Sequence, residues 1–86
     1  MPDRVYLNVI SDFDTTGYLR PRFITWKDGR IFRIEEIRDY RPASIYRNGM
    51  KGACYTVVIL GKTRRLFLER TDDRETGRIG RWFVEQ

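Results

Sequence analysis

Histidine is absent from this chain of 86 residues, and cysteine occurs once, as Cys54. Without histidine, the chain lacks the commonest metal ligand and the commonest general base near neutral pH. A single cysteine supports neither an intramolecular disulfide nor a cysteine-based zinc site. These absences exclude a Ser-His-Asp or Cys-His catalytic arrangement within the chain, and they favour a protein that is not an enzyme.

Long apolar segments are also missing. The longest uninterrupted apolar run is the four residues from Val57 to Leu60, whereas a membrane-spanning helix needs about 20. The first residues, Met-Pro-Asp-Arg, lead into a strand-like stretch and do not resemble a signal peptide. With no export signal and no disulfide pair, we predict a cytoplasmic location and no membrane partner.

Carboxylates gather in three short groups: Asp12-x-Asp14, Glu35-Glu36 and Asp72-Asp73-x-Glu75. Metal sites and hydrolytic pairs need carboxylates that converge at defined separations. The first and third groups lie in turn-like segments, where such side chains usually cap backbone N–H groups in contact with solvent. A glycine-rich phosphate loop is absent too. We therefore expect no catalytic residue, no metal ligand and no cofactor.

Arginine and aromatic residues dominate what the chain does contain. Seventeen basic residues, fourteen of them arginine, face twelve acidic ones, which gives a net charge of +5. The hydrophobic content of 41% and aromatic content of 14% exclude intrinsic disorder. The length predicts a single domain, residues 1–86.

Turn residues divide the chain into short segments that alternate or are rich in β-branched and aromatic side chains. We expect strands at residues 4–10, 22–27, 30–34, 53–60, 64–69 and 81–85. Residues 35–44 fit either a bulged strand or a helical turn, 48–52 a loop, 61–63 a turn and 71–80 a polar loop. Five or six antiparallel strands in so short a chain predict an all-β fold: a small barrel or strongly curved sheet, similar in size to an SH3 domain.

The pair Asp28-Gly29 between two strand-like runs predicts a hairpin with a two-residue type I′ turn. This register pairs Trp26 with Ile31. It also predicts an apolar face formed by three residues, Ile24, Trp26 and Ile31. An exposed face of this kind suits self-association or a protein partner.

Basic and aromatic residues are interleaved around this hairpin and along the last strands. Small β-barrels that bind single-stranded nucleic acid combine a cationic groove with rings on which bases stack, and arginine favours bidentate contacts with phosphate. The candidate nucleic-acid-binding residues are Arg22, Trp26, Lys27, Arg30, Arg33, Arg64, Arg65 and Arg81. The opposing interpretation places the aromatic rings in the core. Nucleic acid is the leading ligand, and a protein-interaction or self-associating module is the alternative.

Three segments resemble a family of short uncharacterised bacterial proteins that is common in clostridial and related Gram-positive groups. They are residues 21–34, 55–59 and 80–85, the last reading Gly-Arg-Trp-Phe-Val-Glu. A more distant similarity is to a domain of unknown function in which a Trp-x-Gly-Arg hairpin precedes a closing Arg-Trp-x-Val-Glu strand. Members of that group accompany translesion DNA polymerases in bacterial genomes. The resemblance implies an all-β fold and a DNA-associated or polymerase-partner role, and it supplies no catalytic residues.

Overall fold

Seven β-strands in one sheet, and no helix, make up the part of the chain that the structure describes. The structure is a computed structural model, and it describes residues 3–45, 51–73 and 75–85. The strands are β1 (Arg4–Phe13), β2 (Leu19–Thr25), β3 (Ile31–Arg33), β4 (Glu36–Ile45), β5 (Lys51–Ile59), β6 (Lys62–Asp73) and β7 (Arg78–Glu85). The predicted all-β class is confirmed, with seven strands instead of five or six.

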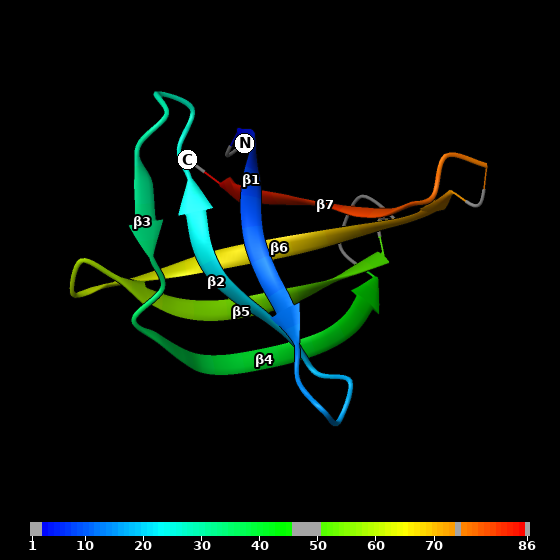
Figure 1. Cartoon of the computed structure of the whole chain (residues 1–86), viewed down its shortest axis with the longest axis horizontal. Helices are drawn as coiled ribbons and strands as arrows, with labels where there is room; N and C mark the ends of the chain where they lie inside the picture. The colour runs from blue at the N-terminus through cyan, green and yellow to red at the C-terminus, as the bar shows by residue number, and fades with distance from the viewer. Residues whose placement is uncertain (1–2, 46–50, 74, 86) are drawn as a thin grey trace.

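The sheet is an antiparallel meander that curls into a half-barrel. Its strand order is β3-β2-β1-β7-β6-β5-β4, so the first strand pairs with the last. In Figure 1, β1 to β3 cross in front of β4 to β7. The two edge strands, β3 and β4, follow one another in the chain. Between them, the Ile34 N–H donates to the Arg22 carbonyl at 2.9 Å and the Glu35 N–H donates to the Val58 carbonyl at 2.8 Å.

The core lies on the concave face of this curled sheet. Its buried members are Leu7, Ile24, Ala53, Tyr55, Val57, Ile59, Leu66 and Leu68. They recur at every second position of β5 and β6, as expected when one face of a strand is buried. The convex face carries a smaller aromatic group in which the Phe67 and Phe83 rings stack with their centroids 5.0 Å apart.

Side chains close part of the seam between β2 and β4, two strands that do not pair with each other in the described part of the chain. The Tyr55 hydroxyl donates to the Leu19 carbonyl at 2.8 Å. Tyr18 packs edge-on against Tyr40, with ring centroids 5.4 Å apart. These tyrosines therefore join the two ends of the sheet from the inside.

The β2–β3 hairpin differs from its predicted form. Its loop has three residues, because the Trp26 N–H donates to the Arg30 carbonyl at 2.8 Å and the Gly29 N–H donates to the Trp26 carbonyl at 2.9 Å. Gly29 has a φ of 90°, whereas Asp28 does not have a positive φ. A type I turn followed by a left-handed glycine gives this loop, so the two-residue type I′ turn was wrong.

The extra loop residue shifts the pairing, so that Ile24 lies opposite Phe32. Since side chains alternate between faces, this shift of one residue changes which β3 side chains share a face with Ile24: Phe32 does, and Ile31 does not. Ile24 is 3% exposed in the core, Trp26 packs against that core, and Ile31 is 62% exposed. The predicted apolar face of Ile24, Trp26 and Ile31 therefore does not exist.

The two-residue turn occurs instead between β5 and β6. Leu60 and Gly61 have φ values of 52° and 73°, and Ile59 pairs with Lys62. The turn predicted at 61–63 was thus placed too late, and β6 begins at Lys62. This start brings Lys62 and Arg64 into the same alternating row as the buried Leu66.

Other boundaries also moved. Residues 36–45 form a strand, with register shifts between Ile37 and Asp39 and between Arg41 and Ser44. This settles the choice between strand and helical turn in favour of a bulged strand. The polar loop predicted at 71–80 is shorter, because β6 continues to Asp73, which pairs with Arg78. Most of the loop predicted at 48–52 lies outside the described residues.

Candidate functional site

A cavity of about 650 Å³ opens between the β2–β3 and β5–β6 hairpins, and we call it the mouth pocket. Its floor consists of core residues, among them Leu7, Val57 and Leu66. Half-buried Trp26 and Phe32 form a wall. The volume lies within the range of pockets that bind small molecules or single groups of a larger ligand.

The rim of the mouth pocket is basic because its cations continue the rows of core residues. On β6, Lys62 and Arg64 lie four and two residues before the buried Leu66, so all three side chains lie on the concave face. On the facing hairpin, Arg30 precedes Phe32 by two residues and also lines the pocket. The concave face therefore changes from apolar to basic where it meets solvent.

Among the described residues, no carboxylate forms an ion pair with three of the cations that line the pocket. Lys62, Arg64 and Arg65 line the pocket, and none of them forms an ion pair with a residue in the described ranges. Glu85 is the acidic side chain among the pocket's described lining. Unpaired, exposed cations around an apolar floor favour an anionic ligand with a flat or apolar part.

Arg30 is held in place by its own hairpin. Its Nε lies 2.6 Å from a carboxylate oxygen of Asp28, and its guanidinium lies 5.5 Å from the centroid of the Phe32 ring. Hydrogen bonds from the backbone and side chain of Arg30 lower the pKa of Asp28, so this carboxylate remains charged at neutral pH. Arg30 is thereby positioned over the ring that forms the pocket wall.

A second cavity, of about 610 Å³, lies on the other side of the β2–β3 hairpin, and we call it the side pocket. Lys27 and Arg81 line it, and Trp26 lines both this pocket and the mouth pocket. The Lys27 ammonium nitrogen lies 5.9 Å from the centroid of the Trp26 ring. Trp26 therefore connects two neighbouring cavities that both carry cations.

Arg81 is engaged in a network on the convex face. It donates to Glu69 at 3.2 Å, and its guanidinium lies 4.2 Å from the centroid of the Tyr6 ring. Tyr6 also donates to Glu69, at 2.7 Å. Although partial burial of Glu69 acts in the opposite direction, these hydrogen bonds and the charges of Arg81 and Arg4 lower its pKa. Arg81, one of the predicted site residues, thus already binds Glu69 and packs on Tyr6 within the fold.

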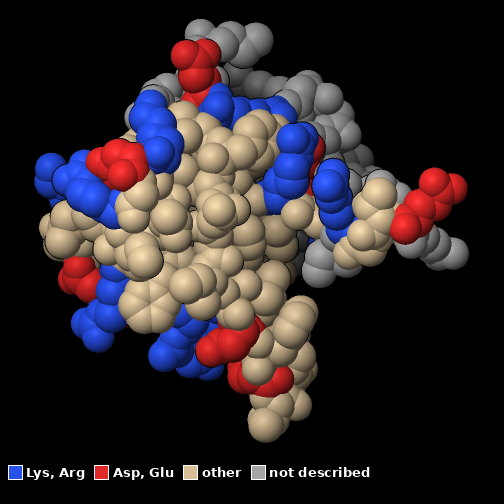
Figure 2. Space-filling view, turned by 45° about the horizontal axis from the view of Figure 1, so that its top comes forward, with Lys and Arg blue, Asp and Glu red and all other residues tan. Residues whose placement is uncertain are grey.

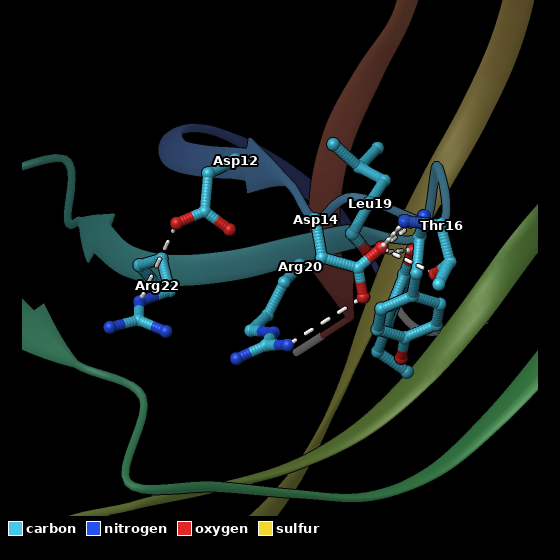
Figure 3. Close-up of polar contacts among 8 residues, drawn as sticks. Asp12, Asp14, Thr16, Leu19, Arg20 and Arg22 are labelled. Atoms are coloured by element: carbon cyan, nitrogen blue, oxygen red, sulfur yellow. Dashed lines mark hydrogen bonds and ion pairs between the residues drawn. The ribbon is translucent and has the colours of Figure 1, made fainter.

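Arg22 and Arg33 lie apart from the mouth pocket and line a cavity of about 490 Å³ beside the seam. Arg22 is 4.0 Å from Asp12, and its neighbour Arg20 is 3.7 Å from Asp14 (Figure 3). Asp14 in turn accepts hydrogen bonds from the backbone of the β1–β2 turn, as expected for a turn carboxylate.

The structure thus brings together four of the eight predicted site residues. Trp26, Arg30, Arg64 and Arg65 line the mouth pocket, although alternation along β6 places the Arg65 side chain on the convex face with Phe67. Two further residues of this site, Lys62 and Phe32, were not among the predicted ones. Recognising Leu60-Gly61 as a two-residue turn would have placed Lys62 in the row of Arg64 and Leu66.

A metal-binding cluster or a reactive thiol would support catalytic chemistry. The described residues contain no group of three or more His, Cys, Asp or Glu side chains that could hold a metal ion. Burial raises the pKa of the Cys54 thiol, which works against a reactive thiolate. Within the same residues, there is no helix of a length and hydropathy suited to crossing a membrane.

No protein-family model, no curated protein and no solved structure matches the chain. The mouth pocket is therefore the basis on which a function can be assigned.

Proposed function

We propose that this chain is a non-enzymatic, cytoplasmic module that binds single-stranded nucleic acid at the mouth pocket. The observation that carries the proposal is the convergence of two hairpins around one cavity, one bringing Trp26 and Arg30 and the other bringing Lys62 and Arg64. Proteins that bind single strands combine stacking rings with cations that follow the phosphate backbone.

The wall and rim suit the two parts of a nucleotide. Trp26 and Phe32 are half-buried, so part of each ring is accessible to a base while the rest packs on the core. Lys62 and Arg64 are exposed and have no ion pair with a described residue, so contact with phosphate would break no existing salt bridge. In the view of Figure 2, basic side chains, with some acidic ones between them, border a broad uncharged area.

The shared position of Trp26 favours a polymer over a single nucleotide. A strand that stacks a base on Trp26 can place one neighbouring phosphate near the rim of the mouth pocket and another near Lys27 in the side pocket. Both pockets are wide enough for such a group, and both carry cations beside an aromatic ring. A DNA-associated role is also what the family resemblance implies.

Fluorescence anisotropy of labelled single-stranded DNA, duplex DNA and RNA at low and physiological salt tests the proposal. We expect micromolar binding of a single strand that weakens as salt rises, because phosphate contacts release counterions. In the double variant Lys62→Gln/Arg64→Gln, the slope of log K against log salt should fall by about 1.4, which is 0.7 for each lost phosphate contact on a single strand.

The matched control is Arg38→Gln/Arg41→Gln on β4, which removes the same charge. Arg38 and Arg41 lie 3.5 Å and 3.4 Å from Glu36 and Asp39, and neither lines the mouth pocket. We expect this control to keep the salt slope of the unmodified protein. Equal effects in the two variants would reduce the binding to net charge alone and contradict the proposed site.

The alternative, a protein-interaction or self-associating module, loses the surface on which it was based, because Ile24 is buried and Trp26 faces the pocket. Light scattering on the same samples distinguishes it from nucleic-acid binding. A mass near twice that of the monomer, unaffected by added salt and accompanied by no oligonucleotide binding, would favour the alternative.

A further inference from the structure

Leu60 is an unusual residue for its position. It is the first residue of the two-residue turn between β5 and β6, with a φ of 52°, and it is 72% exposed. No other described residue except glycine has a positive φ. For a residue such as leucine, the left-handed conformation is roughly five- to thirty-fold less populated than the right-handed one. Turns of this kind prefer Asn or Gly.

Stability of the hairpin does not account for Leu60. Asparagine or glycine would relieve the backbone conformation, and a polar side chain would suit the exposure. Unfavourable backbone conformations that persist often mark functional positions. Here the position is part of a site, because Leu60 lines the mouth pocket together with Lys62 and Arg64 from its own hairpin.

The rings of the other hairpin line the same cavity as this turn. Trp26 and Phe32 line the same cavity, so the pocket has aromatic surface on one hairpin and an exposed aliphatic side chain on the other. A flat group inserted between them would bury apolar area on both of its sides. The neighbouring cations would then contact the charged part of the same ligand.

We propose that Leu60 packs against the face of an unpaired base held in the mouth pocket, so that the site selects unstacked bases over duplex. This inference rests on the proposed function and names what the pocket receives. An aliphatic side chain gains nothing from a phosphate, but it gains from covering an apolar base face. A duplex hides its base faces by stacking, so Leu60 contributes to single-strand binding and not to duplex binding.

The test is Leu60→Asn, which relaxes the turn and removes the apolar contact. The substitution should raise the midpoint of thermal unfolding by several degrees, and by at most roughly 4–16 °C if the whole five- to thirty-fold penalty is relieved. It should also weaken binding of an oligothymidine by about tenfold, the loss expected when much of a leucine side chain is no longer buried. Weak duplex binding should stay unchanged. A gain in stability combined with a loss of affinity is not expected from general damage to the fold.

Two further variants complete the comparison. Leu60→Ala removes most of the side chain but keeps the unfavourable backbone conformation, so it should lose affinity without the gain in thermal midpoint. Ile31→Asn is the matched control, because Ile31 is 62% exposed and does not line the mouth pocket. We expect Ile31→Asn to bind oligothymidine as the unmodified protein does.

The outcomes separate the inference from the proposed function. If the unmodified protein binds oligothymidine and Leu60→Asn binds it equally tightly, the role of Leu60 is refuted while the proposed function stands. Equal losses for single strand and duplex would also refute selection of unpaired bases. If the unmodified protein binds no oligonucleotide, the proposed function fails, and the inference fails with it.

Discussion

Removing the hydroxyl of Tyr55 tests how the half-barrel is held together. Tyr55 is 2% exposed, and its hydroxyl donates to the carbonyl of Leu19 at 2.8 Å. Leu19 begins β2 and Tyr55 lies in β5, two strands that are not neighbours in the sheet. This hydrogen bond therefore connects the two halves of the curled sheet across the seam.

The Tyr55→Phe variant removes the hydroxyl that donates to a partly buried backbone carbonyl. A typical intramolecular hydrogen bond contributes about 1 kcal/mol net, and an orphaned polar group raises the loss to about 1–2 kcal/mol. For a domain of this size, that loss lowers the midpoint of thermal unfolding by roughly 4–16 °C. Urea titration followed by circular dichroism measures the change in the free energy of unfolding.

Tyr40→Phe is the matched control, because it removes the same atom from a nearby tyrosine. Tyr40 is partly exposed, and no hydrogen bond of its hydroxyl to another described residue occurs. Its stability should change by less than about 0.5 kcal/mol, as for most surface substitutions. Equal stabilities of Tyr55→Phe and the unmodified protein would refute the role of this hydrogen bond in closing the seam.

The same pair of variants carries a pH dependence. Burial, together with the nearby Tyr40 and Tyr18, raises the pKa of Tyr55 above the ordinary value of 10.0. A pKa raised on folding contributes stability that is present below the unfolded pKa and is lost as the pH rises beyond it. The difference in stability between the unmodified protein and Tyr55→Phe should therefore shrink between neutral pH and about pH 11.

Two more substitutions separate packing from binding. A Cβ on Gly80 would lie 2.5 Å from the Glu69 carbonyl oxygen. Gly80→Ala should therefore destabilise the fold by about 2–3 kcal/mol, as measured by urea titration. An unchanged urea midpoint would contradict the close approach of β6 and β7. Trp26→Leu keeps apolar volume against the core but removes the flat ring. It should weaken oligothymidine binding by about tenfold while the fold stays intact, and undiminished affinity would remove Trp26 from the site.

The fold class was predictable because the turn residues and the alternation of apolar side chains are local signals. Register was not, since it depends on one residue in one loop. Asp28-Gly29 suits a two-residue turn and a three-residue loop equally well in sequence, but the first places Ile31 on the face of Ile24 and the second places Phe32 there. The pattern of Leu60-Gly61 was missed for a related reason: leucine is a poor sequence signal for a left-handed position.

The residue types of the site were predictable, but their positions in the fold were not. Arginines and aromatic rings were expected to act together, and the structure divides them among three cavities. Which residues meet depends on long-range pairing, since the β2–β3 and β5–β6 hairpins are brought together only by the curl of the sheet. Some ion-pair partners could not be identified from the sequence either, because they lie on neighbouring strands: the partner of Arg22 is Asp12 on β1.

Mapping the binding surface by ¹⁵N–¹H NMR tests the central claim most directly. Unlabelled oligothymidine is added to ¹⁵N-labelled protein at low salt, and backbone amide shifts are followed. We predict that the largest changes occur in residues 26–32 and 59–66, the two hairpins around the mouth pocket, with little change in β4. Changes centred on Tyr6 and Arg81, or on β4, would contradict the assignment of the mouth pocket as the nucleic-acid site.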